Sequence, residues 1–283
     1  MDRLEPSLCR EFARRALAED IGSGDITSLA LLSSGENARA IIVAREALTV
    51  AGLDLAMATF REIDDAIECE RTSEEGQSLA AASPILCLSG SARALLSGER
   101  TALNFLQRLS GIATLTAKYH AAIEGTGARL LDTRKTTPGW RVFEKHAVAC
   151  GGGTNHRMGL YDMVLIKDNH LAALRSEANP IATAIARAKE ACPGFKIEAE
   201  ADTLEQAAQA AEAGADIILL DNMPPVKLSE AVQLVAGRSK LEASGGITMA
   251  NIRAVAETGV DFISVGALTH SPQAVDIAMD FDA

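Results

Sequence analysis

A chain of 283 residues, 48% of them hydrophobic, is long enough to bury a substantial core in one large or two moderate domains. Its formal net charge of −11 argues against nucleic acid as a partner. The five cysteines are scattered without a C-x-x-C pair, and no apolar run is as long as a membrane span. We therefore expect a protein of the reducing cytosol with neither a disulfide framework nor a zinc site.

The first half of the chain is predicted to combine helices with antiparallel strands. Residues 7–19 have an amphipathic helical pattern, and the glycines of 22–25 end it, so Asp25 is expected in a helix-ending turn rather than in a functional loop. A second helix is expected over 53–63. Strands are expected within 38–50, around 67–69 and over 84–90. This pattern indicates an α+β domain.

Residues 92–120 are predicted to form a long helical region that is broken at Ser110-Gly111. Arg100 lies on the flank opposite the apolar residues of this helix. From the pattern alone it is a solvated surface cation.

From residue 129 onward short apolar strands alternate with alanine-rich helices. The predicted strands are 129–132, 163–166, 195–198, 216–220, 240–243 and 262–265. Helices such as 203–213 and 249–258 lie between them. Short buried strands that alternate with helices favour parallel pairing, and six such units predict a closed or partly open α/β barrel.

Polar or glycine-rich residues follow every one of these strands. They are 133–135, 167–170, Glu200, 221–222, 244–246 and 266–270. Because the carboxyl ends of parallel strands form the ligand face of a barrel, six such endings favour a binding site. The glycine-rich endings at 244–247 and 266–268 are typical of phosphate binding.

Basic side chains are concentrated in one stretch of this acidic chain. Between residues 132 and 170 lie Arg134, Lys135, Arg141, His156, Arg157, Lys167 and His170. Gly151, Gly152 and Gly153 let backbone N–H groups approach a ligand closely. The stretch indicates a pocket for a polyanionic small molecule.

These segments together resemble the quinolinate phosphoribosyltransferase family. The resemblance is carried by DTRKTTPG (132–139), GGGTNHR (151–157), IKDNH (166–170), LDN (220–222), EASGGI (242–247) and VGALTH (265–270). It continues in the first half at GDIT (24–27) and ERT (99–101). Several motifs in the right order make the resemblance specific.

The resemblance implies a pentosyl transferase of NAD biosynthesis, which makes nicotinate mononucleotide, pyrophosphate and CO₂ from quinolinate and phosphoribosyl pyrophosphate. It implies an N-terminal α+β domain over 1–112, on which the tail 271–283 packs, and a partly open α/β barrel over 113–270. It also implies a homodimer, or a higher oligomer, with an active site shared between subunits. Mg²⁺ is expected to bind with the donor's pyrophosphate rather than in a dedicated protein cage.

The resemblance also implies roles for individual residues. Lys135, Glu200 and Asp221 are expected to be catalytic. Substrates are expected to contact Arg100, Thr133, Arg134, Lys135, His156, Arg157, Lys167, Glu200, Asp221, Ser244, Gly245, Gly246, Gly266 and Ala267. Arg100 would enter from the partner subunit. His170 and His270 receive supporting roles, and His120 and His146 are expected to be ordinary helix residues.

Two alternatives remain open at this point. One is a paralogue of the same fold associated with molybdenum transport, which is expected to differ at 155–157 and 167–170. The other is a silent barrel that only binds a phosphorylated ligand or a protein. The charged residues at every strand end make the second alternative the weaker one.

Overall fold

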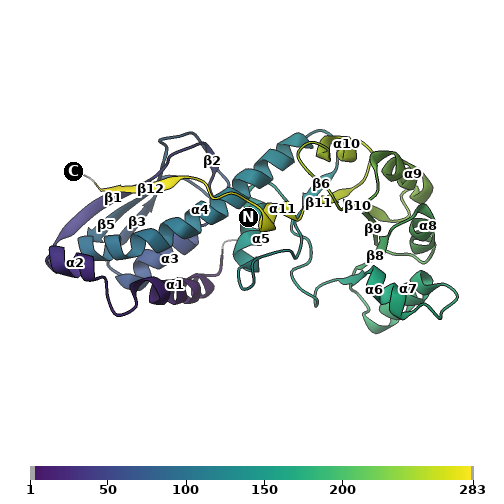
Figure 1. The fold of residues 1–283 in the computed structure, drawn as a ribbon, viewed down its shortest axis with the longest axis horizontal. Coiled ribbons are helices and arrows are strands. Elements are labelled where there is room, and N and C mark those ends of the chain that lie inside the picture. The colour runs from purple at the N-terminus through teal and green to yellow at the C-terminus, as the bar shows by residue number, and fades with distance from the viewer. Residues whose placement is uncertain (1–3, 282–283) are drawn as a thin grey trace. The chain divides into compact units, whose positions relative to one another are not determined.

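The computed structural model describes residues 4–281, which form two compact units (Figure 1). Within that range the first unit contains 4–117, 142–152 and 271–281, and the second contains 118–141 and 153–270. The predicted combination of an antiparallel α+β part with a parallel α/β part is confirmed. None of the helices described is long and apolar enough to cross a bilayer.

The first unit is built on a four-stranded antiparallel sheet. Its strands in spatial order are β12 (Ile277–Phe281), β1 (Asn37–Ala44), β5 (Pro84–Ser91) and β3 (Glu68–Arg71). A short pair, β2 (Leu48–Thr49) and β4 (Ser78–Leu79), forms a separate ribbon. The last strand of the chain thus pairs with the first, with Ile42 opposite Met279.

Five helices accompany this sheet. They are α1 (Pro6–Ile21), α2 (Ile26–Leu31), α3 (Leu53–Ile63), α4 (Ala92–Ala122) and α5 (Arg141–Cys150), of which α4 continues into the second unit. The turn that ends α1 has Gly22 at φ +53°, as predicted from its glycines. Asp25 then begins α2, because its carboxylate accepts hydrogen bonds from the backbone N–H groups of Thr27 and Ser28.

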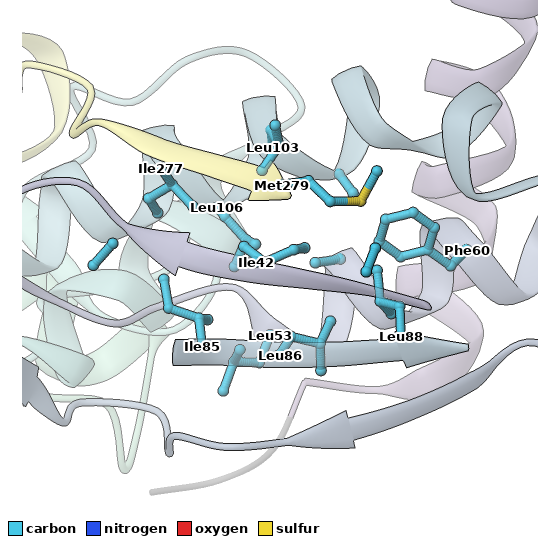
Figure 2. Close-up of a cluster of buried hydrophobic side chains, with 14 of the residues drawn as sticks. Ile42, Leu53, Phe60, Ile85, Leu86, Leu88, Leu103, Leu106, Ile277 and Met279 are labelled. Carbon is cyan, nitrogen blue, oxygen red and sulfur yellow. The ribbon is translucent and has the colours of Figure 1, made fainter. Parts of the chain in front are cut away.

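Apolar side chains from the sheet and from α3 and α4 form the core of this unit (Figure 2). Ile42 and Leu86 come from neighbouring strands, Phe60 from α3 and Leu106 from α4, and all four are fully buried. Because such a core is close-packed, we expect Phe60→Ala to lower the free energy of unfolding by about 3–5 kcal/mol.

The predicted break at Ser110-Gly111 was wrong, because α4 continues through both residues and through position 112. The hydroxyl of Ser110 donates to the carbonyl of Ala51 and accepts from the backbone N–H of Ala51. A Cβ on Gly111 would lie 2.1 Å from the carbonyl oxygen of Gln273. The glycine therefore allows another segment to approach the helix and does not end it.

The second unit contains a six-stranded, entirely parallel sheet. Its spatial order is β6 (Arg129–Leu131), β11 (Phe262–Ser264), β10 (Lys240–Ser244), β9 (Ile217–Asp221), β8 (Ile197–Ala201) and β7 (Val164–Ile166). The described strands leave the barrel open between β6 and β7, which fits the predicted partly open barrel. Thr154 adds a single parallel bridge beside Leu131 at the β6 edge.

Helices follow these strands in the chain. They are α6 (Asp168–Ala173), α7 (Pro180–Ala191), α8 (Leu204–Glu212), α9 (Pro225–Val235), α10 (Ile252–Ala256) and α11 (Ala267–His270). Side-chain caps fix two of their starts: Asn179 caps α7, and Thr203 forms a capping box with Gln206 on α8. The predicted helix over 249–258 is shorter in the structure.

Strand β8 begins and ends later than predicted, so Glu200 lies inside it and not after it. The predicted strand, 195–198, included Glu198 but placed Glu200 among the polar residues that follow it. An open barrel can accept acidic side chains where its interior is polar, and Glu198 and Glu200 follow that pattern.

Candidate functional site

A cavity of about 770 Å³ lies at the carboxyl ends of the six parallel strands. Its lining includes all the predicted site residues except Arg100, namely Thr133, Arg134, Lys135, His156, Arg157, Lys167, Glu200, Asp221, Ser244, Gly245, Gly246, Gly266 and Ala267. Arg100 lies on α4 in the first unit. The volume suits a ligand of substrate size.

Another cavity, of about 370 Å³, lies over the sheet of the first unit. Its one cation, Arg39, is accompanied by Glu68 and Glu70. It therefore lacks the cationic lining that a polyanion requires, and the larger cavity is the candidate site.

Asp132 joins two of the sequence motifs at the edge of the larger cavity. Its carboxylate is fully buried and accepts a hydrogen bond of 2.7 Å from the backbone N–H of His156 and another of 2.7 Å from the amide of Asn155. The backbone of Thr154 bonds β6 on the same side. The segment that carries His156 and Arg157 is thus fixed to the end of β6.

His156 is held by two buried carboxyl groups that sequence reasoning did not select. Its Nδ1 accepts from the N–H of Arg157, so we assign its proton to Nε2, which lies 3.0 Å from Glu198 and 3.6 Å from Glu242. Burial, followed by the charge of Glu198, raises the pKa of Glu242 well above its ordinary value. The protonated, uncharged form of Glu242 is thus favoured in the folded protein more than in the unfolded chain.

Arg134 and Arg157 place two guanidinium groups near each other. Burial, followed by the charge of Arg134, lowers the pKa of Arg157. Arg157 donates to the carbonyl of Met163 at 3.2 Å, whereas the buried Nε of Arg134 has no hydrogen-bond partner within residues 4–281. Two neighbouring guanidinium groups of this kind can hold a carboxylate-bearing ligand.

The two lysines are held through their backbones. Lys135 donates its N–H to the hydroxyl of Thr133, and its carbonyl accepts from Thr269. The N–H of Lys167 is bonded to Nδ1 of His170 at 2.8 Å. His170 thus supports the start of α6, where Lys167 is the N-cap residue.

Arg141, which belongs to the basic stretch, and His270, which lies outside it, behave differently from each other. Arg141 bonds Thr136 and the carbonyl of Met158 and does not line the cavity. His270 does line it, beside Gly266. Among the histidines expected to be ordinary helix residues, His146 lies beside Glu75 in the first unit.

Three carboxyl groups form an acidic cluster at the cavity, and two of them, Glu200 and Asp221, line it. One oxygen each of Glu200, Asp202 and Asp221 lies within 4.8 Å of the others. Burial raises the pKa of Glu200, Lys167 opposes this shift, and Asp221 adds to it. Asp202 lies outside the sequence motifs, and no pattern in the chain marked it as a partner of the predicted pair.

Backbone turns form the wall between β9, β10 and β11. Asn222 (φ +54°) donates its N–H to the carbonyl of Ser244, and Gly245 has φ +87°. A Cβ on Gly245 would lie 2.2 Å from Oδ1 of Asn222. Gly266 lies so close to Lys135 that its Cβ would be 3.0 Å from the lysine Cδ. Glycine is therefore required at position 245, whereas at position 266 the flexible lysine chain could move aside; at both, bare backbone is available to an anion.

Known proteins match this chain over nearly its whole length. Residues 25–110 match the quinolinate phosphoribosyl transferase N-terminal domain, and residues 112–280 match the C-terminal domain. The nicotinate-nucleotide pyrophosphorylase [carboxylating] of Mycobacterium leprae is 42% identical over 277 residues, which cover 96% of each chain. A probable enzyme of the same name from Bacillus subtilis is 44% identical, over 93% of this chain and 89% of its own.

Solved structures agree with the sequence matches. The nicotinate-nucleotide pyrophosphorylase from Francisella tularensis superposes with a TM-score of 0.93 at 39% identity, covering 99% of this chain and 98% of its own. The matched regions include every motif that lines the cavity. The chain belongs to the quinolinate phosphoribosyl transferase family.

Proposed function

We propose that this protein transfers the phosphoribosyl group of 5-phosphoribosyl 1-pyrophosphate to quinolinate and releases pyrophosphate and CO₂, so that nicotinate mononucleotide is formed for NAD synthesis. The observation that carries the proposal is one cavity whose lining combines Arg134 and Arg157 with glycine turns and the Glu200–Asp221 pair. The names of the relatives from B. subtilis and M. leprae support it.

Quinolinate carries two adjacent carboxylates, which suit the cationic part of the cavity. We assign them to the forks of Arg134 and Arg157, supported by Lys167 and His156, because a guanidinium binds a carboxylate through two parallel hydrogen bonds. The free Nε donor of Arg134 supports this assignment. Glu198 and Glu242 then keep the ring of His156 in one orientation.

We assign the 5′-phosphate of the donor to the turns at Ser244, Gly245 and Gly246 and at Gly266 and Ala267. Backbone N–H groups and the Ser244 hydroxyl are the available donors there. Lys135, which packs on Gly266 and shares the cavity with Arg134, would contact both substrates.

Glu200 and Asp221 are the proposed catalytic carboxylates. As the C1′–O bond to pyrophosphate breaks and the bond from C1′ to the quinolinate nitrogen forms, positive charge develops on the ribose. A carboxylate fixed beside it stabilises that charge more than it stabilises the ground state. The product pyridinium can then accept the electron pair left at C2 when CO₂ departs, and C2 afterwards takes up a proton.

A magnesium ion is expected with the donor. The acidic cluster of Glu200, Asp202 and Asp221 fits this ion, because carboxylate oxygens are its preferred protein ligands. When bound with the donor, Mg²⁺ would neutralise the charge that develops on the departing pyrophosphate.

The test is an assay of pyrophosphate and CO₂ with the two substrates and Mg²⁺. Wild type should release both in equal amounts, and Asp221→Asn should lower kcat by about 100-fold, in line with the loss of one electrostatic group. Asp280 is an exposed aspartate on β12 that pairs with Arg45. Asp280→Asn therefore serves as the control and should keep wild-type kcat. If wild type releases neither pyrophosphate nor CO₂, the result would favour the molybdenum-associated paralogue or a silent barrel.

We also propose that the working unit is a homodimer in which Arg100 of one subunit reaches the quinolinate site of the other. Its support is that Arg100 belongs to the motif ERT (99–101), in the region that matches the family's N-terminal domain.

A further inference from the structure

Three potential metal ligands meet in the first unit, away from the proposed active site. Glu75 lies in the turn between β3 and β4, and His146 and Cys150 lie on α5. One ligand atom from each lies within 4.8 Å of the others. The two helical ligands are four residues apart, so they lie on the same face of α5.

Within this group, Oε2 of Glu75 is the central atom. It lies 3.5 Å from Sγ of Cys150 and 3.6 Å from Nε2 of His146. Zinc bond lengths at tetrahedral angles require about 3.6 Å between sulfur and oxygen ligands and about 3.4 Å between nitrogen and oxygen ligands. The observed separations therefore match two edges of a zinc coordination tetrahedron.

The imidazole of His146 is buried in the first unit. Its side chain is 7% exposed, and its Nε2 has no hydrogen-bond partner among residues 4–281, although it faces the Glu75 carboxylate. A buried polar nitrogen without a partner is costly, and a bound cation would satisfy it. Glu75 and Cys150 would supply two negative charges when both are ionised, which would neutralise a divalent ion.

Close packing fixes the group before any ion binds. Gly76 (φ +80°) lies against the carbonyl of Cys150, with its Cβ position 3.0 Å from that oxygen. A Cβ on Gly151 would lie 2.4 Å from the carbonyl of Ala113. The β3–β4 turn and the end of α5 are thus held together by backbone contacts, and the ligand atoms need little rearrangement.

We propose that Glu75, His146 and Cys150 form a binding site for Zn²⁺ or a similar borderline-soft divalent ion, with water at the fourth position. Nitrogen and sulfur ligands distinguish it from the oxygen-only acidic cluster, which suits Mg²⁺. The ion would join the β3–β4 turn, the start of α3 and α5. This site uses no residue of the cavity, so it is independent of the proposed transferase activity.

A competing explanation is that Glu75 only caps a helix. Its carboxylate accepts from the N–H groups of Gly52 and Leu53 at the start of α3, at 2.7 to 3.1 Å. Cys150 would then remain a neutral thiol, since burial and next the charge of Glu75 raise its pKa. Zinc must displace that thiol proton, so binding should tighten as pH rises.

The experiment is a metal titration of the full-length, reduced protein after treatment with a chelator. Wild type should retain one Zn²⁺ per chain after gel filtration, and Co²⁺ should produce a thiolate-to-metal charge-transfer band. Cys150→Ala and His146→Gln should each lose the band and weaken Zn²⁺ binding more than about 100-fold, beyond the loss typical of an outer partner.

Cys192→Ala is the matched control, because it removes a thiol from the end of α7 in the second unit and should keep both signals. Unfolding curves of the metal-free proteins check that each variant is folded, and Cys150→Ser replaces Cys150→Ala if the latter is not. Wild type that retains no more Zn²⁺ than Cys150→Ala, or a Co²⁺ complex without a sulfur band, would overturn the proposal and leave Glu75 as a helix cap.

Discussion

The buried carboxylate of Asp132 accepts a 2.7 Å hydrogen bond from the backbone N–H of His156 and so fixes a loop residue to the end of β6. The same carboxylate bonds the amide of Asn155 through its other oxygen. Arg157 follows directly in the chain. The position of the proposed quinolinate clamp therefore depends on an aspartate that itself does not line the cavity.

We predict that Asp132→Asn lowers both stability and activity. Asparagine can accept only one of the two hydrogen bonds and turns an N–H donor toward the other partner, which costs about 1–3 kcal/mol at a buried position. Urea unfolding should show this loss, and kcat/KM for quinolinate should fall because His156 and Arg157 are less well fixed.

A second exchange tests whether the hydrogen-bond pattern is the cause. In Asp132→Asn/Asn155→Asp, the new asparagine can accept from His156 and donate to the new aspartate. Part of the lost stability should return, as a coupling energy between the two positions. Additive effects in the double variant would show that the pair does not act as a unit.

The clamp itself is tested by Arg157→Lys. The charge remains, but the fork is lost, and a charge-assisted hydrogen bond contributes about 1.5–3 kcal/mol. Calorimetry should therefore show quinolinate affinity reduced by about 10–100-fold. Arg129→Lys, at the opposite end of β6 over the ring of Phe262, is the matched control and should bind like wild type. Unchanged affinity in Arg157→Lys would rule out the clamp.

Much of the architecture was predictable because the local patterns were strong. The strand–helix alternation after residue 129 predicted all six parallel strands, and the polar strand ends predicted residues that do line one cavity. Parallel strands bring their carboxyl ends together whatever the details of packing. The location of the site was therefore predictable from this general geometry and did not depend on individual side chains.

The missed features depend on contacts between distant segments. A helix break at Gly111 is predicted wrongly because the contact that requires this glycine is with Gln273, more than 160 residues away in the chain. Glu198 and Glu242 were not selected because each, taken singly, is an acidic residue in a strand. The ring of His156 between them became visible only in three dimensions.

The raised pKa of Glu242 predicts a pH effect on stability. Its pKa is raised in the folded protein by burial and then by Glu198, so above the ordinary glutamate pKa of about 4.3 the folded state binds a proton that the unfolded state has lost. The free energy of unfolding should then fall as pH rises through that range. The glutamine of Glu242→Gln is uncharged at every pH, so this variant should become more stable relative to wild type as pH rises.

Urea unfolding of both proteins across this range measures the difference. Glu230→Gln, on α9 where the side chain pairs with Lys227 at the surface, controls for the loss of one carboxyl group. If the difference in the free energy of unfolding between wild type and Glu242→Gln stays constant with pH, the raised pKa of Glu242 is contradicted.

The close approach at Gly245 predicts a defect in donor binding. Alanine there must adopt φ +87° and bring its Cβ within 2.2 Å of the Asn222 side chain, so the turn has to move. We expect KM for phosphoribosyl pyrophosphate to rise at least about tenfold, which corresponds to 1.4 kcal/mol. Gly237→Ala has a similar φ of +75° but no atom within 4 Å, so it should cost about 1–2 kcal/mol of stability and leave KM unchanged. Equal KM values in the two variants would show that the turn does not hold the donor.

The proposed dimer predicts that two inactive variants restore each other. Arg100→Ala removes the arginine that its own subunit would lend to the partner, whereas Lys135→Ala damages the cavity of its own chain. In a mixed dimer both lesions fall in one site, and the other site contains an intact Lys135 and receives an intact Arg100. Random pairing makes about half of all dimers mixed, so about a quarter of the sites should be active.

The measurement is the formation of nicotinate mononucleotide after equal amounts of the two variants are unfolded and refolded together. Each variant refolded alone provides the baseline, and distinct affinity tags on the two chains show how many dimers are mixed. Restored activity should increase in proportion to the mixed fraction, because each mixed dimer contributes one complete site. If mixed dimers form and activity stays at the baseline, Arg100 serves the cavity of its own chain or none, and the shared-site proposal fails while the assignment of the cavity to quinolinate stands.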